Sequence, residues 1–139
     1  MQMQTDAYLF AYGTLRKSFR FQAKAALENE LAHIGEAIVK ASLYDLGDYP
    51  GAVRENESDE VTGDVFLICN PNTVLPVLDA YEGDQYRRAQ EKVVMQNARE
   101  LEAWIYWYGE SVKDKKKIGN GDYVDYLRSK RVLSGSVEK

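Results

Sequence analysis

Glu82 is the residue whose type and position best suit acid–base chemistry. It ends an apolar helical pattern that runs into Gly83 and then into a strand pattern that opens on arginines. A carboxylate in the last turn of a helix lies at the negative end of the helix dipole, and the flanking Tyr81 and Tyr86 would partly bury it. Both effects raise the pKa of a carboxyl group towards neutrality. Glu82 is therefore a candidate to accept a proton and give it back.

An alternative assigns no chemistry to this position. Glu82 would then be an ordinary exposed residue at a helix end, and Gly83 would be the glycine that ends the helix. Residue type and spacing alone favour this alternative, because carboxylates with a shifted pKa are a minority of helix-end acids. Both interpretations stay open on these residues.

A second candidate is the glycine turn near the N-terminus. Residues 7–12 form a short apolar and aromatic run that predicts a buried central strand, and Gly13-Thr14 ends it with a tight turn. A glycine at the end of a strand lets backbone N–H groups point into free space, where they can receive a carboxylate or an oxyanion. A simple strand-terminating turn explains the same residues at least as well.

The elements that must position these residues follow from periodicity. Apolar residues at helical spacing predict helices over 19–34, from the Asn70-Pro71-Asn72-Thr73 segment to Glu82, and over 123–131 with Asp122 as a cap. In the second helix, Asn72 or Thr73 is expected to cap and Pro76 to fall in the first turn. Apolar runs predict a strand or a bent pair of strands over 36–46, and strands over 61–69, 88–95 and 101–108, the last two as a hairpin.

Composition restricts the class of protein. The chain has 139 residues, 45% hydrophobic and 29% charged, which suits one domain spanning residues 1–139. Its net charge of −4 disfavours a nucleic-acid partner, because such a partner requires a basic face. No run is long enough to span a bilayer and no secretion signal opens the chain, so a cytoplasmic location without membrane contact is expected.

The single cysteine and the single histidine carry no predicted chemistry. Cys69 closes the apolar run over 61–69 and is expected to be a small buried hydrophobe. His33 has no companions at metal-ligand spacing. We therefore expect His33 to be a surface or hydrogen-bonded residue, and we expect no metal site.

Four motifs in sequence order resemble the gamma-glutamylcyclotransferase-like family, of the gamma-glutamylamine cyclotransferase type. They are Tyr12-Gly13-Thr14-Leu15, Leu43-Tyr44-Asp45-Leu46-Gly47 with Tyr49-Pro50-Gly51, Gly63-Asp64-Val65-Phe66, and Leu78-Asp79-Ala80-Tyr81-Glu82-Gly83 with Tyr86-Arg87-Arg88. Their order and spacing match from Tyr8 to about Tyr126, and Gly121-Asp122-Tyr123 resembles a late family signature. No single motif is specific, but the set in this order is. It therefore favours Glu82 as a functional carboxylate over the ordinary helix-end residue that spacing alone favoured.

The resemblance implies an α+β fold, a small mostly antiparallel barrel-like sheet with surrounding helices. It also implies a reaction: the α-amino group of a γ-glutamyl compound attacks its own γ-carbonyl, giving 5-oxoproline and a free amine, with Glu82 as the catalytic acid and base. The residues implied to bind substrate are Tyr12, Gly13, Thr14, Leu15 and Tyr86. The implied reaction needs neither a metal nor an organic cofactor, and its partner is a small γ-glutamyl molecule for a monomer or a homodimer.

Other interpretations remain beside this one. Tyr49, Arg87 and Tyr108 are further candidates to line the pocket, with sheet packing or a surface ion pair as an equal alternative. The alternative function is a non-catalytic small-molecule binding or regulatory domain of the same fold, and a third is an interaction module that uses its aromatic sheet as an interface. The resemblance does not identify the leaving amine, because family members act on glutathione-like peptides, γ-glutamyl-lysine isopeptides and γ-glutamyl-protected intermediates.

Overall fold

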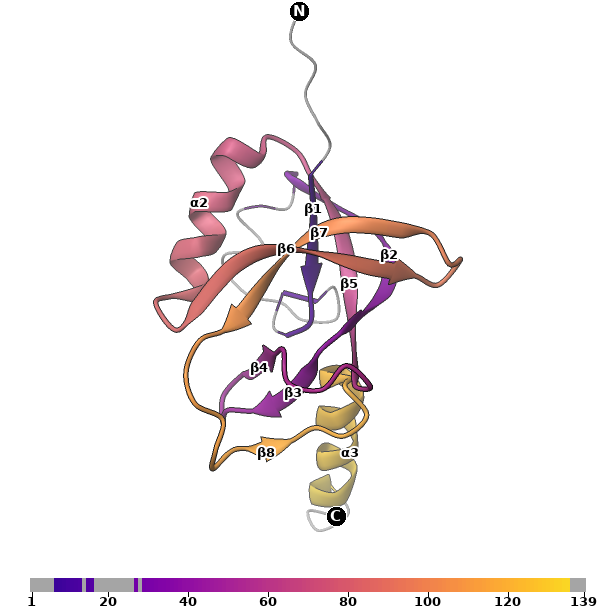
Figure 1. Ribbon diagram of the computed structural model, residues 1–139, viewed down its shortest axis with the longest axis vertical. Coiled ribbons are helices and arrows are strands. Elements are labelled where there is room, and N and C mark those ends of the chain that lie inside the picture. The colour runs from indigo at the N-terminus through magenta and orange to yellow at the C-terminus, as the bar shows by residue number, and fades with distance from the viewer. Residues whose placement is uncertain (1–6, 14, 17–26, 28, 136–139) are drawn as a thin grey trace, which may run out of the picture.

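The computed structural model describes residues 7–13, 15, 16, 27 and 29–135. Within them, strands wrap into a barrel and two helices lie outside it (Figure 1). The strands are β1 (Ala7–Ala11), β2 (Leu31–Lys40), β3 (Ser42–Asp45), β4 (Pro50–Val53), β5 (Glu60–Ile68), β6 (Tyr86–Met95), β7 (Glu100–Tyr108) and β8 (Lys116–Lys117), and the helices are α2 (Pro71–Glu82) and α3 (Tyr123–Gly135).

Five strands close the barrel in the order β1-β5-β2-β6-β7. Neighbours in this order are antiparallel, and a parallel contact between Leu9 and Trp104 joins β1 back to β7. β4 extends from β7 through a parallel contact between Ala52 and Trp107, and β3 and β8 follow it. The predicted α+β class and mostly antiparallel barrel-like sheet are therefore confirmed.

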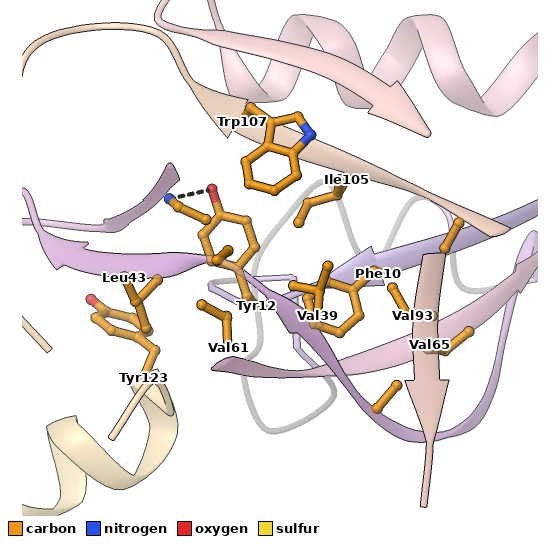
Figure 2. Packing of buried hydrophobic residues seen from close by; sticks show 14 of the residues in the cluster. Phe10, Tyr12, Val39, Leu43, Val61, Val65, Val93, Ile105, Trp107 and Tyr123 are labelled. Carbon is orange, nitrogen blue, oxygen red and sulfur yellow. Dashed lines mark hydrogen bonds between the residues drawn. The ribbon is translucent and has the colours of Figure 1, made fainter. Parts of the chain in front are cut away.

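Side chains on both faces of β1 are buried. On the inner face, Phe10 packs inside the barrel against Val39, Val65 and Ile105, all at most 2% exposed (Figure 2). On the outer face, its neighbour Leu9 belongs to a second apolar cluster, which also contains residues of α2. A strand covered on both faces needs a continuous apolar run, which is the pattern that predicted it.

α2 begins earlier than predicted, at Pro71. Asn70 precedes it with a left-handed φ of 52° and makes no side-chain capping hydrogen bond, so the cap predicted at Asn72 or Thr73 is wrong. Pro71 takes the first helical position, where a missing N–H is harmless. Pro76 lies inside the helix and not in its first turn, because the earlier proline already opens the helix.

The helix predicted over 19–34 is wrong at its C-terminal end. Residues 31–34 belong to β2, which pairs with β5, and the Glu30 N–H donates to the Leu27 carbonyl at 2.8 Å in a turn just before it. Residues 19–26 and 28 of that prediction lie outside the described residues. Gly35 does not end the element, since β2 passes it with a shift of register between His33 and Gly35.

Cys69 is exposed, so the prediction of a buried residue is wrong. The buried part of β5 ends at Ile68, and the Cys69 N–H donates to the Glu30 carbonyl at 2.8 Å where the chain leaves the barrel towards α2. An apolar run does not show which of its residues is the last to point inward. Sequence pattern alone therefore could not separate Cys69 from Ile68.

Other predicted elements are confirmed. The hairpin over 88–95 and 101–108 is formed by β6 and β7, and the bent pair over 36–46 is formed by β2 and β3. The last helix is α3, and the Asp122 side chain caps it by accepting from the Asp125 N–H at 3.1 Å. In the described ranges, no helix has the length and apolar character needed to cross a membrane. The cytoplasmic location stays a prediction.

Candidate functional site

The end of α2 carries Glu82 towards the barrel. Leu75, Leu78 and Glu82 are spaced three and four residues apart, so they share one face of the helix. Leu78 is fully buried in the same apolar cluster as Leu15, which follows β1. Gly83, with a φ of 87°, then ends the helix. Apolar packing between these segments therefore brings the carboxylate and the turn after β1 together.

A cavity of about 480 Å³ lies where the end of β1, the start of β4 and the end of α2 meet. Its lining consists of Phe10, Ala11, Tyr12, Gly13, Leu15, Asp48, Tyr49, Pro50, Tyr81, Glu82, Tyr86 and Tyr106. The structure thus brings Tyr12, Gly13, Leu15, Glu82 and Tyr86, all named from the sequence, to one hollow. Thr14 lies outside the described residues. The roles of these residues towards a substrate stay predictions.

The Glu82 carboxyl group is half-buried in the lining of the cavity. Within the described part of the chain, no hydrogen bond or ion pair reaches it, and burial raises its pKa from 4.5 to about 7. Burial is one of the two causes that the sequence suggested, the other being the helix dipole, and both Tyr81 and Tyr86 line the cavity beside Glu82. A carboxyl group with this pKa exchanges its proton readily near neutral pH.

Tyr12 forms part of the frame of the cavity. Its hydroxyl donates to the Tyr106 carbonyl at 2.6 Å and accepts from the Ala52 N–H at 3.1 Å, the second of which is drawn in Figure 2. These bonds join the end of β1 to β7 and β4. Because the hydroxyl is committed to the backbone, Tyr12 presents its ring to the cavity. Tyr86 is similarly committed, donating from its hydroxyl to the Pro50 carbonyl at 2.7 Å.

Asp79, Tyr106 and Arg88 form a polar network behind the cavity that sequence reasoning missed. The Arg88 guanidinium binds both oxygens of Asp79, at 2.8 and 3.1 Å, and the Tyr106 hydroxyl donates to Asp79 at 2.6 Å. Arg88 and then Tyr106 lower the pKa of Asp79. Two carboxylates three residues apart on one helix therefore have opposite shifts, which leaves Glu82 as the one that can change its charge near pH 7.

The turn after β1 packs closely against Pro50, another residue of the cavity lining. A Cβ atom added to Gly13 would lie 2.9 Å from Cγ of Pro50, so only glycine fits without movement. The Arg16 N–H donates to the Gly13 carbonyl at 3.0 Å, which closes the turn. Among the described residues, no acceptor is found for the N–H of Gly13 or of Leu15. In the described part of the chain, these two donors are therefore available to a ligand.

The three further pocket candidates, Tyr49, Arg87 and Tyr108, lie in different places. Tyr49 lines the cavity, and its hydroxyl donates to the Gln85 side chain at 3.2 Å. Arg87 instead lines a second hollow on the other side of Tyr86. Tyr108 lines neither and packs with its ring centroid 5.6 Å from that of Tyr86, so the sheet-packing alternative holds for it.

Carboxylates near the cavity are separated from one another. Glu82 and Asp48 lie on different segments of its lining, and Asp79 is paired with Arg88 behind it. In the part of the chain that the structure describes, no three or more histidine, cysteine, aspartate or glutamate side chains group as metal ligands would. The described lining of the cavity therefore offers the carboxyl groups of Glu82 and Asp48, backbone N–H donors and aromatic walls.

The raised pKa of Glu82 predicts a pH-dependent effect on stability. Because the folded protein holds this proton more tightly than the unfolded chain does, ionised Glu82 opposes folding increasingly from pH 4.5 to about 7 and by a constant amount above that. Relative to the wild type, Glu82→Gln should therefore gain up to about 3 kcal/mol of unfolding free energy between pH 4 and pH 8. Urea denaturation at these two pH values measures the change.

Asp79→Asn is the matched control on the same helix. Its pKa is lowered in the folded state, so ionised Asp79 supports folding above its ordinary pKa, and that support is lost as pH falls through the folded value. Asp79→Asn should therefore be less stable than the wild type by a nearly constant amount between pH 4 and pH 8, whereas the gain in stability of Glu82→Gln grows over that range. Equal slopes for the two variants would contradict the assignment of Glu82 as the perturbed group.

Comparison with known proteins places the chain in a family. The family model described as gamma-glutamyl cyclotransferase, AIG2-like, matches residues 9–125. A Methanocaldococcus jannaschii protein named "Putative gamma-glutamylcyclotransferase" is 30% identical over 121 residues, covering 86% of this chain and 97% of that protein. The gamma-glutamylcyclotransferase family protein YtfP of Escherichia coli K12 is 33% identical over 120 residues, covering 84% and 96%.

Solved structures share the fold at lower identity. An uncharacterised protein from Pyrococcus horikoshii superposes with a TM-score of 0.70 at 21% identity, covering 91% of this chain and 97% of that one. An AIG2-like protein from Mus musculus superposes with a TM-score of 0.66 at 18% identity, covering 78% and 81%. With the family match across residues 9–125, the conclusion is that the chain belongs to the AIG2-like gamma-glutamyl cyclotransferase family.

Proposed function

We propose that this protein converts a γ-glutamyl amine or peptide into 5-oxoproline and a free amine. Membership of the family supports a cyclotransferase. The observation that carries the proposal is the half-buried Glu82 carboxyl group, which has a pKa of about 7 and no hydrogen-bond or ion-pair partner among the described residues. It lies in the same cavity as the turn at Gly13 and Leu15. Residues far apart in the sequence thus supply a proton carrier and backbone donors to one hollow.

Glu82 moves the protons in the proposed reaction. The substrate's α-amino nitrogen bonds to its γ-carbonyl carbon, and the bond from that carbon to the amine nitrogen breaks. The attacking nitrogen changes from an ammonium to a lactam N–H and loses two protons, while the leaving nitrogen gains two as it becomes an ammonium. Ionised Glu82 accepts from the first nitrogen and, once protonated, donates to the second. No water is consumed, and the proton count balances.

The turn after β1 stabilises charge in this proposal. The N–H groups of Gly13, Thr14 and Leu15 would hold the oxyanion that develops on the γ-carbonyl, or the substrate's α-carboxylate. Loss of one such preorganised donor typically costs about 2.7–4 kcal/mol of transition-state stabilisation. The rings of Tyr12 and Tyr86 act as walls, because both hydroxyls already bond to the backbone.

The cavity also orders the substrate. Its volume of about 480 Å³ suits a small molecule, since ligand pockets commonly span about 300–1,000 Å³. Ring closure fixes several torsions of an extended glutamyl chain, and well-oriented intramolecular reactions can gain on the order of 7–11 kcal/mol from such ordering. Ordering, charge stabilisation and proton transfer together need no cofactor.

The test is a panel of γ-glutamyl compounds assayed in water enriched in ¹⁸O. The panel holds glutathione, γ-glutamyl-ε-lysine and γ-glutamyl derivatives of simple alkylamines. At least one is expected to release 5-oxoproline and its amine in equal amounts, with no ¹⁸O in the product, because water takes no part. The matched control is the same substrate with its α-amino group acetylated, which cannot attack and should not react.

Two results would overturn the proposal. Release of ¹⁸O-labelled glutamate would identify a hydrolase. Saturable binding of γ-glutamyl ligands without turnover across the panel would identify the non-catalytic binding domain that is the alternative function. Chelator treatment that leaves the rate unchanged is the expected result of a reaction run by Glu82 and backbone donors alone.

A further inference from the structure

We propose that Arg16 is a positioning residue, which fixes the direction of the Gly13 and Leu15 N–H groups by locking the turn that carries them. This inference deepens the proposed function and rests on it. Arg16 immediately follows the turn, yet it does not line the cavity. Its backbone N–H holds the turn closed through the Gly13 carbonyl at 3.0 Å, and its side chain points into a buried polar cluster.

All three nitrogens of the Arg16 guanidinium bind carboxylates. Nε lies 3.1 Å from Asp64, Nη1 lies 2.9 Å from Asp122, and Nη2 lies 3.3 Å from Glu36. The three acids come from different elements: Asp64 from β5, Glu36 from β2 and Asp122 from the start of α3. Arg16 is 3% exposed, so the segment after β1 is anchored to three separate parts of the fold.

The carboxylates form a site that requires a cation at its centre. Asp64 and Glu36 are direct partners across the β2–β5 ladder, where like charges repel. Asp64 is 1% exposed, and its second oxygen is taken by His33 Nε2 at 3.0 Å. The planar guanidinium presents donors from three separate nitrogens at fixed angles, whereas lysine has one nitrogen on a flexible stem and cannot reproduce that arrangement. The geometry therefore selects arginine, not merely a positive charge.

An ion-pair network of this kind fixes the position of the segment that carries Arg16 more than it stabilises the fold. Burying an arginine with acids commonly gains little over apolar packing, because desolvation offsets the attraction. Its effect here falls on one short segment, held at one end by the Tyr12 hydroxyl and at the other by the Arg16 fork. Donors that stabilise an oxyanion must be oriented before the reaction, and a shift of about 1 Å can cost on the order of 100-fold in rate.

The test compares Arg16→Lys with the matched variant Arg54→Lys. Arg54 is also ion-paired, to Glu91 at 2.7 Å, but its side chain is 56% exposed and lies outside the cavity. Both variants are assayed at a temperature at which thermal unfolding curves show them folded. Arg16→Lys is expected to lower kcat/KM for 5-oxoproline release by ~10–100-fold, and Arg54→Lys to leave it unchanged. A merely structural role of Arg16 predicts equal kcat/KM per folded molecule.

A second measurement keeps the inference testable without turnover. The ¹H–¹⁵N resonances of Gly13 and Leu15 should move in Arg16→Lys and stay in place in Arg54→Lys. If the wild type turns over no substrate, the proposed function fails, and the resonances alone decide the positioning role. If Arg16→Lys does not fold, Glu36→Gln is used instead. It removes only the ion pair between Arg16 and Glu36, whose side chain is 41% exposed, and it should shift the same resonances by a smaller amount. Unmoved resonances, or unchanged kcat/KM in an active protein, would overturn the inference.

Discussion

Replacing Glu82 with glutamine is expected to lower kcat for 5-oxoproline release by ~10²–10⁴-fold, the usual contribution of one general acid and base. Glutamine keeps the size and shape of the side chain but neither accepts nor gives a proton at neutral pH. Since the cavity is unchanged, KM should move little. Single-substrate kinetics on the best compound of the γ-glutamyl panel measure both constants. An active Glu82→Gln variant would show that another group carries the protons.

The pH profile of the wild type identifies the same group independently. Because the base must be ionised, kcat/KM should fall about tenfold per pH unit below a break near the Glu82 pKa of about 7. The residual rate of Glu82→Gln should lack that break. Glu57→Gln, at an exposed position in the loop between β4 and β5, is the control and should keep both the rate and the break.

Gly121→Ala is expected to cost ~2–5 kcal/mol of unfolding free energy, the sum of a left-handed backbone penalty and an overpacking penalty. Gly121 has a φ of 68°, and an added Cβ would lie 1.8 Å from the Glu60 carbonyl oxygen. Its own carbonyl accepts from the Thr62 N–H at 2.8 Å, so the contact cannot relax without loss of that bond. Urea denaturation at pH 7 measures the loss.

Gly119→Ala is the matched control two residues earlier. A Cβ there meets no atom within 4 Å, so the same change of side chain should alter stability by less than ~0.5 kcal/mol, as at other open surface positions. Equal stability of the two alanine variants would contradict the account. Activity should fall in Gly121→Ala even where it folds, because the next residue, Asp122, holds Arg16.

The position of Glu82 could be predicted because its determinants are local. An apolar stripe, a glycine and flanking tyrosines lie within a few residues of one another, and together they predicted the helix end. They also indicated the direction of the pKa shift, but the family resemblance was needed to prefer it over an ordinary exposed glutamate. The start of the same helix could not be predicted, since Pro71 and Pro76 both fit a first turn and only the packing of the whole helix decides between them.

The anchoring of the turn after β1 could not be predicted, because its determinants lie far apart in the sequence. Arg16 stands in the sequence as an ordinary polar residue, and its partners lie 20, 48 and 106 positions away. The commitment of the Tyr12 hydroxyl likewise depends on β4, a strand that the sequence pattern did not reveal. The family resemblance implied that Tyr12 lies near the site, but not which of its atoms is available there.

The wrong element at residues 31–34 reflects competition between local and long-range order. Leu27, Leu31 and Ile34 have helical spacing, yet pairing with β5 makes residues 31–34 a strand. Propensity is a weak prior that a ladder of backbone hydrogen bonds overrides. The prediction held for the 101–108 strand, where a run of aromatic and apolar residues on both faces favoured a strand.

The two walls of the cavity differ in how they are attached to the barrel. One wall, the turn after β1 and the end of α2, is part of the packed core. The other, residues 48–50, leads into β4. This strand meets β7 through a single parallel contact, and the Tyr86 and Tyr12 hydroxyls bind its backbone. Asp48 and Tyr49 can therefore diverge without disturbing the closed ring. If the proposed function holds, substitutions at Asp48 and Tyr49 should change which leaving amine is accepted while Glu82 and the turn after β1 keep their positions.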